Sequence, residues 1–212
     1  MDFNWDKKQR ELYSQTYDFA QKELGEQVVH EGPVSPFPLQ KWKACGQFGL
    51  MGLSIPQEYG GMGLDALTSA HIFEAFGKSC PDRGLLFAAA AHLFAVAMPI
   101  VEFGTPKLKQ YVLPHLASGK WIGANAITEP DAGSDLFSLQ SEADRKGDGY
   151  LLNGKKSFVT NGPIADIVVA YAFTNRKMGY LGISGFIVEK DTAGMVLGDA
   201  FGKAGLHAAQ AG

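Results

Sequence analysis

The first half of the chain has the hydrophobic spacing of helices. Between Phe3 and Leu116, residues such as Leu12, Thr16 and Phe19 recur at intervals of three to five positions, which places them on one side of a helix. Proline and glycine separate these periodic segments from one another. The pattern predicts a bundle of helices.

Capping residues give several of these helices defined ends. One helix is expected from Leu39 to Phe48. The stretch LSIPQEYGGMGLD contains a proline and a cluster of glycines, which predicts a loop. Asp65 at its end is a cap for a helix that continues to about Lys78. Thr105 predicts the start of another helix, Pro106 to Ala117, because threonine caps and proline favours the first turn.

The longest apolar stretch, from Leu85 to Val101, is a candidate for a membrane-spanning helix. His92 and Pro99 interrupt it, and it is shorter than the roughly 20 residues that a bilayer requires. We therefore expect a helix that is buried in the bundle. His92 is expected to be a core histidine that hydrogen-bonds a backbone carbonyl, in preference to a catalytic residue.

After Ser118-Gly119 the pattern changes to that of β-strands. The segments WIGANAIT, DIVVAYAFT and GISGFIVEK are rich in β-branched, aromatic and small residues. Asn153-Gly154 is the strongest hairpin signal, because the tight turns of hairpins need positive φ angles. The chain is thus predicted to be an α+β multidomain protein. An all-α domain over residues 1–119 precedes a mostly antiparallel β domain over residues 120–212.

Composition and charge restrict the function classes. With 212 residues, of which 46% are hydrophobic and 19% charged, the chain can bury a core. A formal net charge of -3 gives no attraction to nucleic acid or to an anionic membrane, so neither partner is expected. The N-terminus has no apolar stretch of the kind found in secretory signals, which predicts a cytoplasmic protein. Cys45 and Cys80 are expected to be buried or free thiols.

Several well-known catalytic and nucleotide-binding motifs do not occur in the sequence. It contains no G-x-G-x-x-G that opens a βαβ unit, no G-x-x-x-x-G-K-[ST], no H-E-x-x-H and no G-x-S-x-G. The histidines are scattered without the spacing of metal ligands, so no metal site is expected. They are His30, His71, His92, His115 and His207.

The segment TEPDAGSD, Thr128 to Asp135, gathers polar and turn-forming residues directly after a predicted strand. Its proline and glycine force a turn, so that the backbone N–H groups near Gly133 and Ser134 have no partner in a sheet. These amides and two hydroxyls suit an anionic oxygen and the polar edge of a ring system. The alternative is a surface turn in which Glu129 and Asp135 cap backbone amides.

SFVTNG, Ser157 to Gly162, is a second candidate segment. Its aromatic, β-branched and threonine side chains can offer a stacking face and a hydrogen bond to a flat heterocycle. By itself, it is equally a strand that ends in a turn.

The two segments, in this order, resemble the flavin signatures of the acyl-CoA dehydrogenase family. AITEPDAGSDLFS, Ala126 to Ser138, is similar to the flavin loop of the family, and FVTNG to its second flavin segment. Further similarity lies in GFIVEKDTAGMVLG and, upstream, in GLMGLSIPQEYGGMGLD and FGTPKLKQYVLPHLASGKWIGANAITEP. The resemblance covers nearly the whole chain. It implies a helical N-terminal domain and a β-barrel-like middle domain that binds FAD.

The resemblance also implies roles for individual residues. The segment from Asn125 to Ser134 would line the isoalloxazine and the pyrophosphate, with Thr128 at the pyrimidine edge. Ser134 would lie between the flavin phosphate and the thioester substrate, Thr160 near N5 and O4 of the ring, and Phe158 against the ring. The implied cofactor-binding residues are Asn125, Ala126, Ile127, Thr128, Gly133, Ser134, Phe158, Val159 and Thr160.

The reaction implied by the resemblance is α,β-dehydrogenation of an acyl thioester. A carboxylate removes the α-proton and the β-hydrogen passes as hydride to flavin N5, which gives a trans-2-enoyl thioester. Coenzyme A or an acyl carrier protein would carry the substrate, and an electron-transfer flavoprotein would accept the electrons. A homo-oligomer and a role in fatty-acid metabolism are further expectations.

Several residues depart from the family pattern. Phe158 stands where tryptophan is usual, and Asp131 where a small residue is common. In FGKAGLHAAQAG, Ala204 and His207 replace a methionine and an arginine. His207 is expected to be a neutral turn residue.

No residue of the chain is assigned as the catalytic base, which the family carries in a C-terminal helical domain. We expect Glu129 to be structural, and we expect the chain to be a fragment that is inactive by itself. Two alternatives are open. One is an oxygen-using flavin oxidase or hydroxylase of the same superfamily, and the other is a non-catalytic binding or scaffold protein.

Overall fold

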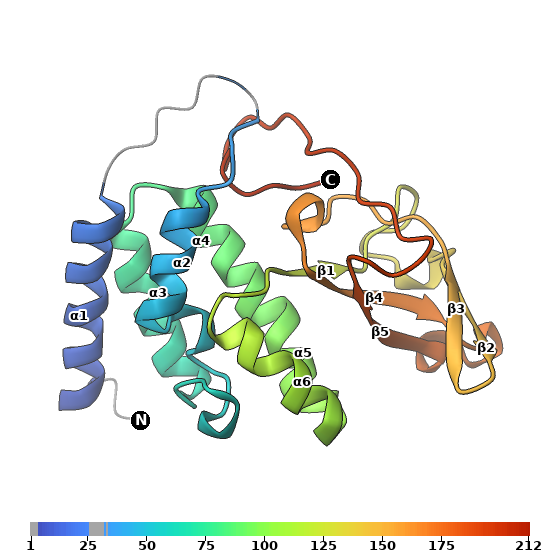
Figure 1. Ribbon diagram of the computed structural model, residues 1–212, viewed down its shortest axis with the longest axis horizontal. Coiled ribbons are helices and arrows are strands. Elements are labelled where there is room, and N and C mark those ends of the chain that lie inside the picture. The colour runs from blue at the N-terminus through green and yellow to red at the C-terminus, as the bar shows by residue number, and fades with distance from the viewer. Residues whose placement is uncertain (1–3, 26–31, 33) are drawn as a thin grey trace. The chain divides into compact units, whose positions relative to one another are not determined.

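The computed structural model describes residues 4–25, 32 and 34–212 of the chain (Figure 1). Their contacts divide into two compact units, which we describe separately. The first unit ends at Trp121 and also includes Gly202–Ala209. The second unit comprises Ile122–Phe201 and Gln210–Gly212. A short segment near the C-terminus therefore belongs to the first unit.

The first unit consists of helices and short turns. The helices are α1 (Lys7–Leu24), α2 (Leu39–Phe48), α3 (Ala66–Ser79), α4 (Arg83–Ala90), α5 (Met98–Phe103) and α6 (Pro106–Ala117), with a π-helical segment, Ala91–Ala97, between α4 and α5. α1 packs against α3, and α4 to α5 form one continuous helical run. The predicted helical character is confirmed, and α2 has the predicted bounds.

Two predicted caps form in the structure. The Asp65 carboxylate accepts a hydrogen bond from the backbone N–H of Thr68 at 2.9 Å and begins α3. The Thr105 hydroxyl accepts one from the N–H of Leu108 at 3.3 Å and begins α6. Each contact satisfies an N–H group that the helix itself leaves without a partner.

The helical run from α4 to α5 is long and apolar enough to cross a membrane. Arg83–Phe103 has a mean hydropathy of 2.1, and 50% of its apolar window is buried inside the structure. A helix in the core of a folded domain can have the same length and composition as a membrane-spanning helix. The burial agrees with the predicted place of this run in a bundle.

His92 lies in the π-helical segment and is fully buried. Its Nε2 lies 3.1 Å from the carbonyl oxygen of Leu116. Burial lowers the pKa of His92 to about 4, although the backbone contact opposes this shift. The prediction of a core histidine is confirmed.

Trp42 of α2 lies at the centre of the first unit's core. Its indole N–H donates to the carbonyl oxygen of Gly119 at 2.9 Å, which satisfies a polar group with no access to water. Its ring meets the ring of His92 edge-on, with centroids 5.1 Å apart. This contact joins α2 to the long apolar run.

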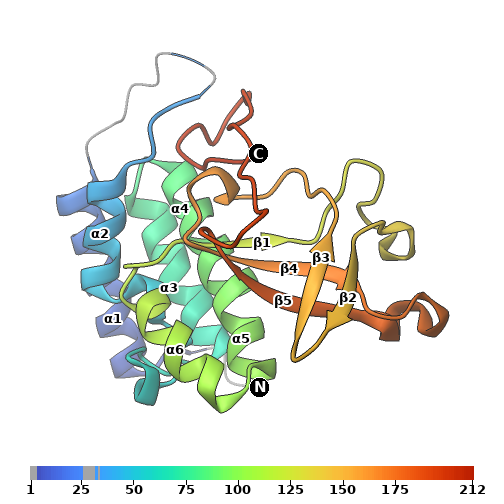
Figure 2. The same cartoon turned by 45° about the vertical axis from the view of Figure 1, so that its right-hand side comes forward.

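A mixed five-stranded sheet forms most of the second unit. Its strands are β1 (Gly123–Ala126), β2 (Glu142–Lys146), β3 (Gly149–Asn153), β4 (Ile167–Phe173) and β5 (Ile183–Glu189). Figure 2 shows β4 between β1 and β5, with β1 parallel and β5 antiparallel to it. β2 pairs in parallel with the end of β4 and forms an antiparallel hairpin with β3.

The prediction of a mostly antiparallel, barrel-like domain is therefore wrong in two respects. Two of the four strand pairings are parallel, because the chain passes through the β2–β3 hairpin between β1 and β4 and returns in the same direction. The sheet is also open, since β3 and β5 pair with no further strand in the part of the chain that the structure describes. A barrel requires that every edge be paired.

The predicted hairpin turn at Asn153-Gly154 is also wrong. The β2–β3 turn is Gly147-Asp148, and Gly147 supplies the positive φ of 61°. Gly154 follows the end of β3, where a Cβ atom would lie 2.1 Å from the hydroxyl oxygen of Ser141. Glycine is required there by the close approach of another segment.

Candidate functional site

The two polar segments predicted from the sequence lie next to each other in the second unit. The backbone N–H of Ser157 donates to the carbonyl oxygen of Thr128 at 2.9 Å. The Lys156 ammonium donates to the carbonyl oxygen of Ile127 at 3.2 Å. β1 leads into the first segment, and β3 leads into the second. Residues 29 positions apart in the sequence thus form one site.

Part of the polar content of the first segment stabilises the turn itself. Glu129 and Ala132 exchange two backbone hydrogen bonds, of 2.9 and 3.2 Å, around a two-residue turn. The Asp135 carboxylate accepts from the N–H of Phe137 at 3.1 Å and from the hydroxyl of Ser138 at 2.5 Å. Asp135 therefore has the capping role of the alternative interpretation.

The middle of the same segment is open. The N–H groups of Gly133 and Ser134, and the hydroxyls of Ser134 and Thr128, make no hydrogen bond to any described residue. Gly133 and Ser134 are exposed, and Thr128 is half-buried. A Cβ atom at Gly133 would meet no atom within 4 Å. These donors are accessible to an anionic oxygen of a ligand.

The second segment pairs with the last residues of the chain. The N–H of Val159 donates to the carbonyl oxygen of Gly212 at 2.8 Å. The N–H of Asn161 donates to the carbonyl oxygen of Gln210 at 2.6 Å. Thr160 lies between these two bonds, and neither its N–H nor its hydroxyl has a hydrogen-bond partner within residues 34–212. Because alternate residues of an antiparallel pair direct their N–H groups outward, Thr160 offers two donors to a ligand.

Phe158 has an unusual backbone conformation at the start of this pairing. Its φ of 59° lies in the left-handed region, as does that of Asn161 at 66°. For a bulky side chain such a conformation costs about 1–3 kcal/mol. The Phe158 side chain is 68% exposed, and its ring lies 5.4 Å from that of Phe201. An exposed aromatic ring held in this way is available to stack on a flat ligand.

Two of the predicted site residues contribute side chains to the core instead. Ala126 and Val159 are both buried and pack in one apolar cluster of the second unit. Only their backbone groups are available to a ligand. Asn125 precedes Ala126 in β1, so its side chain points to the opposite face of the sheet, where it is half-buried. Ile127 is half-buried as well.

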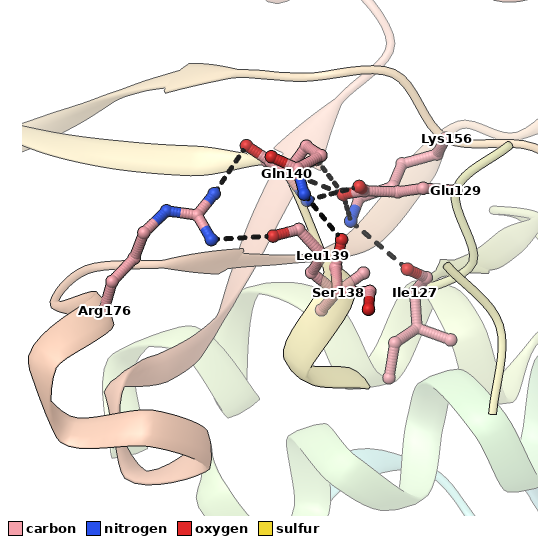
Figure 3. A network of polar contacts seen from close by, with 8 residues as sticks. Ile127, Glu129, Ser138, Leu139, Gln140, Lys156 and Arg176 are labelled. Carbon is pink, nitrogen blue, oxygen red and sulfur yellow. Dashed lines mark hydrogen bonds and ion pairs between the residues drawn. The ribbon is translucent and has the colours of Figure 1, made fainter. Parts of the chain in front are cut away.

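Glu129 is the centre of a polar network (Figure 3). Its side chain is 4% exposed and accepts hydrogen bonds from the N–H groups of Gln140, at 2.5 Å, and Ser141, at 3.0 Å. The Ser141 hydroxyl also donates to it, and the Lys156 ammonium lies 2.8 Å from Oε1. Four donors occupy both carboxylate oxygens, so Glu129 has a structural role.

These contacts determine the charge of the carboxylate. Burial by itself would raise the pKa of Glu129, but the hydrogen bonds from Lys156, Ser141 and the two backbone amides lower it to about 2. Burial lowers the pKa of Lys156, and the neighbouring carboxylate opposes that shift. The resulting ion pair joins the turn of the first segment to the start of the second.

Arg176 continues the network beyond Gln140. Its guanidinium donates to the carbonyl oxygens of Leu139, at 2.9 Å, and Gln140, at 3.1 Å. Its Nε donates to the Glu142 carboxylate at 2.6 Å. Figure 3 shows Gln140 between Arg176 and Glu129. The backbone near Gln140 is therefore held through its carbonyl oxygens by Arg176 and through its N–H groups by Glu129.

The sequence alone does not predict the roles of Lys156, Ser141 and Arg176. Each lies in a stretch where a polar side chain is usually exposed, so no local signal marks it. A buried carboxylate must have donors, and this requirement is the signal that could have found them. This requirement can be applied only when Glu129 is known to be buried, and the burial of Glu129 depends on the fold.

Other predicted features belong to the first unit. Cys45 and Cys80 are buried and free, and burial raises the pKa of the Cys45 thiol. His207 is half-buried. Among the described residues, no group of three or more His, Cys, Asp or Glu side chains could hold a metal ion. Phe3 and His30 lie outside the described residues.

Family models match almost the whole chain. The model described as "Acyl-CoA dehydrogenase, N-terminal domain" matches residues 6–120, and the one described as "Acyl-CoA dehydrogenase, middle domain" matches residues 124–212. The chain belongs to the acyl-CoA dehydrogenase family. The predicted membership is confirmed.

Individual members of the acyl-CoA dehydrogenase family are similar to the chain over its full length. L-prolyl-[peptidyl-carrier protein] dehydrogenase of Pseudomonas fluorescens is 49% identical over 213 residues, which cover 100% of this chain and 56% of that protein. The crystal structure of the prolyl acyl carrier protein oxidase AnaB has a TM-score of 0.92 at 39% identity, covering 98% of this chain and 55% of that one. The FAD complex of PigA also has a TM-score of 0.92 at 39% identity, covering 100% and 55%. The chain spans about half the length of these relatives.

The open donors fit the flavin that the acyl-CoA dehydrogenase family implies. FAD has a diphosphate, which needs N–H or hydroxyl donors, and a flat ring whose polar edge needs further donors. The open groups of the first segment and of Thr160 supply both kinds. The exposed ring of Phe158 supplies an apolar surface for the ring system.

Proposed function

We propose that this chain forms the FAD-binding part of an enzyme that oxidises a CH–CH bond of an aminoacyl thioester on a carrier protein. Membership of the acyl-CoA dehydrogenase family supports the flavin and the reaction class. A prolyl group is the first substrate to test, because the Pseudomonas fluorescens relative, at 49% identity, is named for it. This substrate is one particular form of the acyl thioester expected from the sequence.

Each open donor has a defined role in this proposal. The N–H groups of Gly133 and Ser134 bind the diphosphate, because backbone amides in a turn form an anion-binding concavity. The hydroxyls of Thr128 and Thr160 bind the polar edge of the ring, and Phe158 packs on its face. When bound, FAD supplies the acceptor for the two electrons that leave the substrate.

Ser134 also orients the thioester. The resemblance to the family implies a position for this residue between cofactor and substrate. In support, the residue is exposed and its hydroxyl has no hydrogen bond to a described residue. A donor at the thioester carbonyl stabilises the negative charge that develops when the α-proton leaves. Glu129 is excluded as the base, since four donors already occupy its oxygens.

The contact between the two segments is the observation that carries this proposal. The 2.9 Å hydrogen bond from Ser157 to Thr128 brings the start of the first segment, with the open hydroxyl of Thr128, next to the segment that contains Thr160. A surface turn and an unrelated strand end, as in the alternative interpretation, would have no reason to share a contact. Two adjacent sets of donors suit one extended ligand.

Absorbance spectroscopy of the full-length polypeptide tests the proposal. We expect flavin bands after addition of FAD, and bleaching of these bands when L-prolyl carrier protein is added without oxygen. Bleaching by saturated acyl-CoA alone would contradict the carrier-protein substrate and keep the reaction class. A protein that binds no added FAD would contradict the whole proposal. Flavin bands that no thioester bleaches would favour the non-catalytic alternative.

A flavin oxidase is the second candidate function. The observation that favours it is the name of the AnaB protein, a prolyl acyl carrier protein oxidase whose structure matches this chain with a TM-score of 0.92. Stoichiometric hydrogen peroxide in the presence of oxygen would identify an oxidase. Turnover that requires an electron-transfer flavoprotein would identify a dehydrogenase. This acceptor, a homo-oligomer, a cytoplasmic location and a role in fatty-acid metabolism stay predictions.

A further inference from the structure

A cluster of large apolar side chains is exposed in the second unit, close in sequence to Ser134. Phe137, Met178, Tyr180 and Leu181 are 62%, 54%, 65% and 69% exposed. Phe137 follows Ser134 by three residues, and the other three lie in the 3-10 segment Arg176–Gly182. We call these four side chains the apolar patch.

The two parts of the apolar patch touch each other. The rings of Phe137 and Tyr180 have centroids 6.1 Å apart and meet edge-on. A Cβ atom at Gly179 would lie 3.5 Å from the Phe137 ring. Gly179 has a φ of 57°, which lets the chain turn back between Met178 and Tyr180. Phe137 and Tyr180 thus form one surface, and Met178 and Leu181 are exposed on the same short segment as Tyr180.

Hydrogen bonds within the second unit fix the segments that carry the apolar patch. The loop that bears Met178, Tyr180 and Leu181 is closed by a 2.8 Å bond from the N–H of Thr174 to the carbonyl oxygen of Gly182. Arg176 fastens this loop to the backbone that follows Phe137, through its bonds to residues 139 and 140. A surface that is ordered in advance loses little entropy when a partner binds.

One part of the apolar patch, the segment from Arg176 to Gly182, carries positive charge. The segment from Arg176 to Gly182 contains two basic residues and no acidic one. Arg176 shares its charge with Glu142, whereas the Lys177 ammonium is exposed and forms no ion pair within the described residues. Asp135, two residues before Phe137, keeps its negative charge, because its capping bonds come from neutral donors, so the positive charge lies on the Arg176–Gly182 segment alone. Exposed apolar patches of this kind mark interaction sites, and aromatic residues, methionine and arginine are enriched in them.

We infer that the apolar patch, with Lys177, is the docking surface for the carrier-protein domain that bears the thioester. The inference rests on the proposed function. A thioester on a carrier protein brings a folded domain to the enzyme, so the enzyme needs a surface for that domain near its substrate site. The fitting partner is a domain whose docking face is apolar with acidic side chains at its rim, because Lys177 then finds a counter-charge.

The test compares two forms of one substrate on the full-length enzyme with FAD. The L-prolyl group is offered on the carrier protein and on free pantetheine, which has no protein surface. We expect the double variant Tyr180→Ser/Leu181→Ser to lower kcat/KM for the carrier-protein form about tenfold and to leave the pantetheine form unchanged. Lys177→Glu should lower the same value and make it less sensitive to salt. Val196→Ser, which removes an 89% exposed side chain elsewhere in the second unit, is the matched control.

Three results would overturn the inference. Equal losses with both substrate forms would mean that the apolar patch acts on the site itself. No loss with either form would mean that the carrier protein docks elsewhere. A changed oligomeric mass or a much lower melting temperature of the double variant would mean that a second copy, or another part of the polypeptide, covers the patch.

A failure of the proposed function gives a different result. In that case the wild-type enzyme oxidises neither thioester, and calorimetric titration with the holo carrier protein decides the docking. Binding that the double variant weakens about tenfold supports the inference without any turnover. No binding to the wild-type enzyme overturns it.

Discussion

The loop after β1 has two parts that use polar groups in opposite ways. In one part, the Glu129 carboxylate is buried and accepts four hydrogen bonds. In the other part, the N–H groups of Gly133 and Ser134 are exposed and have no protein partner among the described residues. The two parts are separated by only three residues.

This difference separates stability from binding. A buried carboxylate without its donors would be costly, so the contacts of Glu129 hold the fold together. An exposed amide is satisfied by water, so it adds little to the fold and can exchange water for a ligand oxygen. Substitutions in the first part should therefore change the free energy of unfolding, whereas substitutions in the second part should change the affinity for the ligand.

The largest effect is expected for Glu129→Gln. This change leaves the half-buried Lys156 ammonium without a counter-charge. We therefore expect a loss of about 3–5 kcal/mol in the free energy of unfolding, measured by denaturant titration. Glu142→Gln is the matched control, because the Glu142–Arg176 pair is much more exposed, at 53% and 40%. It should cost less than about 1 kcal/mol. Equal losses for the two variants would contradict the structural role of Glu129.

Acid pH should remove the contribution of Glu129 in a defined range. The folded-state pKa is lowered to about 2 from the ordinary value of 4.5, so the stabilisation is present above 4.5 and is lost as the pH falls through 2. The shift corresponds to about 3 kcal/mol. Unfolding curves at a series of pH values should show this slope for the wild type and a flatter profile for Glu129→Gln. The lowered pKa of Lys156 acts at alkaline pH and leaves this range unaffected.

Two glycines allow the same comparison with smaller effects. Gly154→Ala puts a methyl group 2.1 Å from the Ser141 hydroxyl. We expect the free energy of unfolding to fall by about 2 kcal/mol, which a lower melting temperature would show. Gly133→Ala meets no atom within 4 Å and should leave the melting temperature of the apoprotein nearly unchanged. If Gly133→Ala proved as destabilising as Gly154→Ala, the open part of the loop would be more enclosed than the structure shows.

The smallest effect on stability is expected for the open hydroxyls. Thr128→Val and Ser134→Ala remove groups that have no protein partner in residues 34–212, so the free energy of unfolding should change by less than about 0.5 kcal/mol. Each should weaken FAD binding about five- to tenfold, which corresponds to one lost hydrogen bond of about 1 kcal/mol. Fluorescence titration with FAD measures this loss. Unchanged FAD affinity in both variants would remove these hydroxyls from the site.

The helices were predictable because their signals are local. Asp65 and Thr105 each bond to an N–H three residues away, so the capping residue and its partner appear together in the sequence. The buried place of His92 was predictable for a similar reason, since the apolar residues around it are contiguous. The two flavin-like segments were found as well, because a recurring signature can be read without knowing the fold.

The errors have a common cause in contacts between distant residues. β1, β4 and β5 lie in segments predicted as strands, whereas the charged strand β2 was missed. Nothing in β1 indicates that it pairs in parallel with β4, in which Ile167, the partner of Gly123, lies 44 positions later. The Asn153-Gly154 pair predicts a turn, but the close approach of Ser141 from another segment is the reason for a glycine at position 154. Lys156 and Arg176 were missed because their partners lie 27 and 34 positions away.

The sequence by itself determined the bounds of α2, the capped starts of α3 and α6, the strands β1, β4 and β5, the family and the two segments that form the candidate site. Each of these depends on interactions within a few residues or on a short pattern. Only the tertiary structure decided strand pairing, the open sheet, and which polar groups are buried and which are open. Burial depends on the packing of segments that are far apart in the chain. For this reason Glu129 and Ser134, which look alike as polar loop residues, have different physical roles.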